Sequence, residues 1–99
     1  MTLADALDAA ASTAPDVSRR STPAGVEWAV GDVGFAALSG DTASFRLDPV
    51  VGRAALGTPD TAPSPRGREW VDFTPPVPDR MALDRATAWF GSALRRASA

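Results

Sequence analysis

The side chains with the most evident chemistry in this chain are arginines grouped around one glycine and one tryptophan. They are Arg46, Arg53, Arg66, Gly67, Arg68 and Trp70. Guanidinium groups hold phosphate oxygens through paired hydrogen bonds, glycine lets a ligand approach the backbone, and an indole ring stacks on a nucleic-acid base. The set is typical of an anion-binding or nucleic-acid-binding surface.

The alternative is that these arginines are solvated surface charges that pair with carboxylates nearby in the sequence. The carboxylates in question are Asp48, Asp60, Glu69 and Asp72. Surface pairs of this kind are common and contribute little free energy. Both interpretations place the arginines on the surface, so they differ only in whether the guanidinium groups are free to meet a ligand.

Seven residue types are absent: Cys, His, Lys, Tyr, Asn, Gln and Ile. Without Cys and His there is no thiolate nucleophile, no imidazole base and no ordinary zinc or copper site, and without Lys there is no Schiff base. We therefore predict a protein that is not an enzyme, with no cofactor and no metal site. Asp32, Asp41 and Asp48 are interpreted as turn and cap residues, since no calcium-loop spacing joins them. A carboxylate pair such as Glu69 with Asp72 has too little chain around it to form a glycosidase cleft.

The length and charge predict one small domain spanning residues 1–99. Ten arginines against twelve carboxylates give a formal charge of −2, which offers no global attraction to nucleic acid or to an acidic membrane. No stretch approaches the about 18 apolar residues of a membrane span, and the N-terminus has no basic region before an apolar run. The expected location is the cytoplasm with no membrane association, and the oligomeric state stays open.

The first half of the chain predicts a helix followed by a three-stranded meander. Thr2 and Asp5 have the spacing of an N-terminal capping pair, and the helix should end by Pro15. Residues 16–25 show no periodicity and are predicted to be a loop. Alternating apolar residues then predict three strands, separated by turns at Gly31-Asp32 and at Gly40, where glycine can supply a positive φ in the second turn. These strands are 26–30, 33–37 and 43–47.

The second half predicts a short helix, a proline-rich loop, a fourth strand and a long helix. Asp48 caps a helix that ends at Gly57, where a left-handed residue is expected; residues 58–68 should be irregular, and residues 69–74 alternate as a strand. The last helix spans about 79–97. Gly91 inside it is expected to allow close packing against the sheet. The predicted fold is a single α+β domain in which an antiparallel sheet of about four strands packs against N- and C-terminal helices, with a short helix between strands.

Three short segments resemble the MmcQ/YjbR family: VGDVGFAAL at 30–38, SFRLDP at 44–49 and PRGREWV at 65–71. The similarity covers roughly residues 20 to 98. It implies a compact α+β domain with an antiparallel sheet backed by helices, in a family named for DNA binding through a double-wing arrangement, and it implies no catalytic residues and no cofactor. Members often carry Lys or His around the loop and near the C-terminus, and this chain has neither.

Two functional hypotheses follow from these observations. The first is a small non-enzymatic domain that binds DNA through the arginine set, with Trp70 stacking on a base. The second is a protein-interaction or accessory domain that uses an exposed sheet face or the last helix around Trp89, which lies beside the apolar stripe of that helix.

Overall fold

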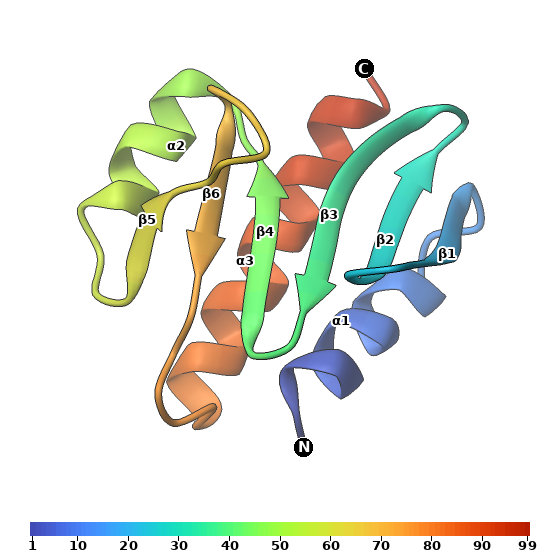
Figure 1. The fold of residues 1–99 in the computed structure, drawn as a ribbon. Helices are drawn as coiled ribbons and strands as arrows, with labels where there is room; N and C mark the ends of the chain where they lie inside the picture. Colours follow the sequence, from blue (N-terminus) through green and yellow to red (C-terminus); the bar gives the residue numbers. More distant parts are fainter.

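The backbone forms one six-stranded antiparallel sheet with the strand order β1-β2-β3-β4-β6-β5, in a computed structural model that describes residues 1–99 (Figure 1). Three helices complete the α+β domain. The elements in chain order are α1 Leu3–Ser12, β1 Val17–Thr22, β2 Gly25–Val30, β3 Val33–Ser39, β4 Thr42–Arg46, α2 Pro49–Leu56, β5 Thr61–Pro63, β6 Trp70–Phe73 and α3 Arg80–Ala97.

Local sequence signals account for the helix starts and for the tight turns. Thr2 and Asp5 form the expected capping box, in which each side chain accepts a hydrogen bond from the other residue's backbone N–H. The Asp48 carboxylate accepts from the backbone N–H of Val50 at the start of α2. Gly31 and Gly40 both have φ of 58°, so the two turns of the meander use the conformation that glycine adopts without strain. Gly57 is different: its φ is −84°, so the expected left-handed residue after α2 is wrong.

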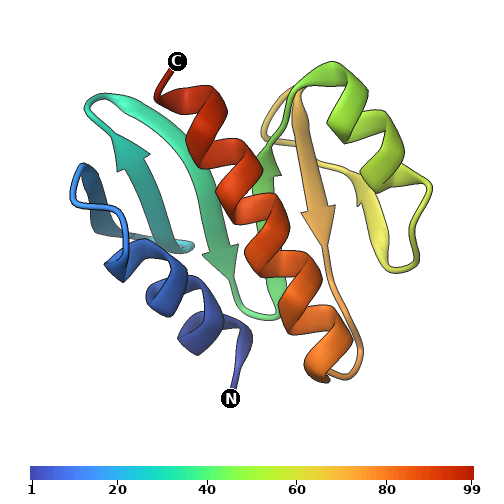
Figure 2. The same cartoon turned by 180° about the vertical axis from the view of Figure 1, so that it is seen from behind.

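Helices α1 and α3 lie side by side against one face of the sheet and enclose the core (Figure 2). Phe90 of α3 meets Trp28 and Phe35 edge to face, with ring centroids 5.7 and 5.1 Å apart. Trp89 is only partly exposed and packs against Phe73 with centroids 5.0 Å apart. The last helix therefore offers no exposed tryptophan patch, because Trp89 closes the side of the core.

The sheet has six strands rather than about four, because two segments expected to be loops pair as edge strands. Residues 17–22 form β1, which runs antiparallel to β2 after a turn in which Thr22 Oγ1 accepts from the N–H of Gly25 at 3.1 Å. Residues 61–63 form β5 beside β6. The first segment is polar and the second is short and ends in a proline, so neither shows the alternation of a half-buried strand. Backbone pairing at the sheet edge, where one side of the strand faces water, fixes them instead.

Gly91 does not pack against the sheet as the sequence suggested. A Cβ placed at Gly91 would meet only Nη1 of Arg95, at 3.4 Å, apart from the helix's own backbone. The glycine faces a groove between α1 and α3. None of the three helices is both long and apolar enough to cross a membrane.

Gly25 is the glycine on which the sheet depends most. Its φ is 153°, and a Cβ there would lie 2.1 Å from the carbonyl oxygen of Leu38 on the neighbouring strand. We predict that Gly25→Ala lowers the free energy of unfolding by about 3 kcal/mol or more, because β2 and β3 would have to separate. Gly31→Ala is the matched control, since its Cβ meets nothing within 4 Å. It should cost only the strain of a left-handed residue, about 1 kcal/mol. Urea denaturation measures both, and equal losses would contradict the prediction.

Candidate functional site

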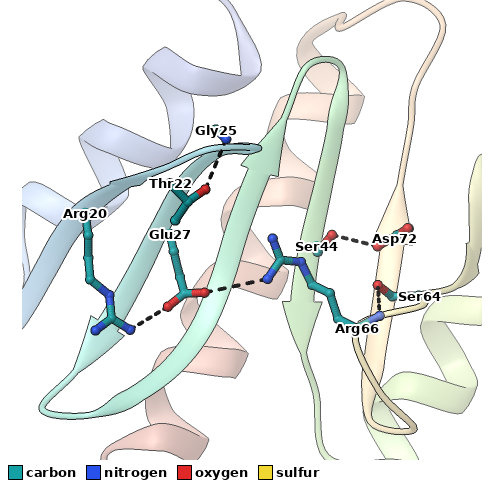
Figure 3. A network of polar contacts seen from close by, with 8 residues as sticks. All are labelled: Arg20, Thr22, Gly25, Glu27, Ser44, Ser64, Arg66 and Asp72. Carbon is teal, nitrogen blue, oxygen red and sulfur yellow. Dashed lines mark hydrogen bonds and ion pairs between the residues drawn. The ribbon is translucent and has the colours of Figure 1, made fainter.

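The face of the sheet opposite α1 and α3 is covered by polar side chains rather than by helices (Figure 3). The strand register places one row of residues side by side across five strands. The row runs through Arg20, Glu27, Ala37, Ser44 and Asp72. Paired residues point to the same face of a sheet, so this row forms the centre of the outer face.

Arg66 lies across this face from the loop between β5 and β6. Its Nη1 is 3.6 Å from Oε2 of Glu27, which also pairs with Arg20, and its guanidinium carbon is 5.3 Å from the centroid of the Trp70 ring. The Arg66 N–H donates to Oγ of Ser64 at 3.2 Å, which fixes the backbone from which the side chain starts. Arg66 is therefore held by an ion pair and a cation–π contact, and it ties the loop to β2.

Ser44 and Asp72 are joined by a hydrogen bond beside this ion pair. The Ser44 hydroxyl donates to Oδ1 of Asp72 at 2.6 Å, and Ser44 is only 6% exposed. An activated serine needs a base that is itself oriented by a third group, and Asp72 makes no other side-chain hydrogen bond and no ion pair. The pair is best explained as a buried polar link between β4 and β6. No group of three or more Asp or Glu side chains converges as a metal site would require.

Arg46 belongs to a second ion-pair network at the end of β4. Its Nε is 3.3 Å from Oε2 of Glu69, and the other carboxylate oxygen lies 2.8 Å from Nη2 of Arg96. Arg96 also donates from Nη1 to the Leu47 carbonyl at 2.7 Å. The hydrogen bond from Arg96 is the main cause that lowers the pKa of Glu69, and the charge of Arg96 and the contact with Arg46 act in the same direction. This network fastens α3 to the segments that follow β4 and precede β6.

Arg53 and Arg68 are the two members of the predicted set that make no ion pair and no side-chain hydrogen bond, and both are exposed. Arg53 projects from α2 and Arg68 from the loop, and both line a cavity of about 300 Å³ at the start of β6. Trp70 also lines this cavity. The apolar residues that line the cavity include Leu47, Leu56, Pro63 and Val71, and the Glu69 carboxylate, which pairs with Arg46 and Arg96, lines it as well.

The structure thus divides the predicted residues into two groups. Arg46 and Arg66 are occupied by carboxylates, whereas Arg53 and Arg68 are free and share one cavity with Trp70. Gly67 has a local packing role, since a Cβ there would lie 3.2 Å from Cδ1 of Trp70.

Sequence reasoning missed Glu27 as the partner of Arg66. The two residues are far apart in the chain, and only the sheet and the loop bring them together. The signal available was that Glu27 alternates with the core residue Trp28 and so had to lie on the outer face. Of the carboxylates expected to pair with the arginine set, only Glu69 does so.

Comparison of the chain with models of protein families, with curated proteins and with solved structures finds no match.

The ion-pair network around Glu69 should make the free energy of unfolding depend on pH in the acid range. A carboxylate whose pKa is lowered by folding stabilises the folded state fully above its unfolded pKa, about 4.3, and loses that stabilisation as the pH falls through the lower folded value. We predict that Glu69→Gln is less stable than the unmodified chain at pH 7 and that the two converge by about pH 3. Urea denaturation at several pH values measures this.

Asp41→Asn is the matched control, because it removes an exposed turn carboxylate that makes no ion pair. A difference between Glu69→Gln and the unmodified chain that stayed constant from pH 7 to pH 3 would contradict the role given to the network.

Proposed function

We propose that this protein is a small non-enzymatic domain of MmcQ/YjbR type that binds nucleic acid, DNA in the first place, in the cytoplasm. The observation that carries the proposal is the pair of free guanidinium groups, Arg53 and Arg68, beside an apolar cavity walled by Trp70. Two cations without carboxylate partners attract two phosphates, and the cavity accepts an unstacked base. The family resemblance supports the same ligand.

A single strand fits this arrangement better than a duplex. At about 300 Å³ the cavity lies at the lower end of the range for small-molecule sites, which suits one ring system with its phosphates outside. Arg66 already covers one face of the Trp70 ring, so a base would meet the part of the ring that borders the cavity. Bases inside a duplex are stacked and paired, and extruding one costs a few kcal/mol.

Binding is expected to be weak and largely independent of sequence. The chain has a formal charge of −2, and only local charge favours a polyanion. No Asn, Gln or Lys is present to read base edges, and the two free arginines are assigned to phosphates.

A peptide is the second candidate ligand, and the exposed apolar side chains of α2 favour it. Val50 is 72% exposed and Leu56, which lines the cavity, is 42% exposed. A short acidic peptide with an apolar side chain would pair with the same two arginines and contact the apolar residues that line the cavity. The surfaces first considered for a protein partner fit less well, because Trp89 is packed against Phe73 and ion pairs cover the sheet face.

The salt dependence of binding tests the proposal. For two phosphates on single-stranded DNA, log affinity should fall against log salt with a slope of about −1.4. We predict that Arg53→Ala with Arg68→Ala brings this slope close to zero. Fluorescence anisotropy of a labelled oligothymidine at several salt concentrations from about 20 mM upward measures it, since weak electrostatic binding is strongest at low salt.

The control is Arg80→Ala with Arg85→Ala, which removes the same charge from two positions of α3 that do not line the cavity. It should leave most of the slope in place. Equal losses in the two double variants would mean that only net charge matters. Absence of binding by the folded protein in low salt would exclude nucleic acid and leave the peptide ligand as the leading candidate.

A further inference from the structure

A groove of about 570 Å³ is lined by residues of both α1 and α3. Figure 2 shows the two helices next to each other across the back of the molecule. The floor is apolar and includes Phe90, Ala6 and Ala10, and Leu83 and Leu94 line the α3 side. The groove is separate from Arg53, Arg68 and their cavity, which lie beside α2 and β6.

Gly91 lines this groove near its middle, and nothing within the chain explains it. Glycine inside a helix lowers helix stability relative to alanine. The position has room for a Cβ, whose only neighbour outside the local backbone would be the flexible end of Arg95. Close approach of a second helix is the physical reason that remains for a residue without a side chain.

Two charged side chains mark the groove along α3. Asp84 and Arg95 both line it, and neither forms an ion pair. Eleven positions of a helix separate them by roughly 16 Å along the axis, so they cannot neutralise each other within one chain. Thr87 and Gly91 lie between them on the same face.

We propose that the groove is a dimer interface whose occupant is α3 of a second copy of this chain. In an antiparallel arrangement about a two-fold axis near Thr87 and Gly91, Asp84 of each copy faces Arg95 of the other. Such an interface is self-complementary, as two-fold symmetry demands, because one helix carries both halves of the ion pair at equal distances from the axis. The dipoles of two antiparallel helices also attract each other, which favours the same arrangement.

Charge complementarity favours a second copy at this groove. It disfavours the alternative dimer, in which the edge strands of two sheets pair. The free edge of β1 carries Arg19 and Arg20, so antiparallel pairing of two β1 strands would place arginines of both copies against one another. The other edge strand, β5, has only three residues and ends in Pro63, so it offers little backbone for pairing with a second copy.

Charge reversal with rescue tests this interface. Asp84→Arg alone sets the introduced guanidinium of each copy against Arg95 of the other, and Arg95→Asp alone creates the corresponding acidic clash. We predict that each raises the dimer dissociation constant about tenfold or more, and that the double variant Asp84→Arg with Arg95→Asp restores it because the pair is only exchanged. Sedimentation velocity over a range of protein concentrations measures the constants, and circular dichroism checks that each variant is folded.

Two further variants sharpen the test. Asp32→Arg reverses an exposed charge in the turn between β2 and β3, outside the groove, and should leave the dissociation constant unchanged. Gly91→Leu should abolish the dimer by filling the place where the helices cross. A protein that stays monomeric at millimolar concentration would overturn the proposal, and so would a dimer that is insensitive to both single reversals. Oligothymidine binding measured on the same variants keeps this result separate from the proposed nucleic-acid site.

Discussion

The packing of Phe90 against the strands is the interaction on which the rest of the structure depends. Its ring meets Trp28 and Phe35 edge to face, which joins α3 to β2 and β3 at the centre of the core. Filling this space with an indole has a cost, because Nε1 of Trp28 is buried without a hydrogen-bond partner, and an unsatisfied donor costs about 1–3 kcal/mol. The burial of a whole indole ring offsets that cost.

Because the helices cover one face of the sheet, the other face has to be covered by side chains from its own strands and loops. Long charged residues do this: Arg66 and Glu27 form an ion pair on this face, and Ala37 and Ser44, in the same row as Glu27, are almost completely buried although they face away from the core. Arg46 and Arg66, two of the four arginines that the sequence suggested as a ligand site, are thus part of the scaffold. They hold the loop that presents Arg68, and this division explains how an acidic chain keeps two free cations at one place.

The two proposed surfaces lie on different parts of the molecule and do not compete. The groove between α1 and α3 is on the helical side, whereas Arg53 and Arg68 flank the cavity beside α2 and β6. A two-fold dimer would therefore present two copies of the arginine cavity at once. For a weak site of two phosphate contacts, joining two such sites on one particle raises the apparent affinity for a long polyanion without any new contact.

The sequence by itself determined the features that depend on neighbouring residues. These are the helix caps at Thr2 and Asp48, the positive-φ turn at Gly40, the alternation of the meander and the amphipathic last helix. Tertiary structure alone decided the rest. The edge strands β1 and β5 are held by backbone pairing with a neighbouring strand, which leaves no side-chain pattern. The division of the arginines between paired and free depended on Glu27, which pairs with Arg66, and on Glu69, which pairs with Arg46, because the sheet brings together charges that are remote in the chain.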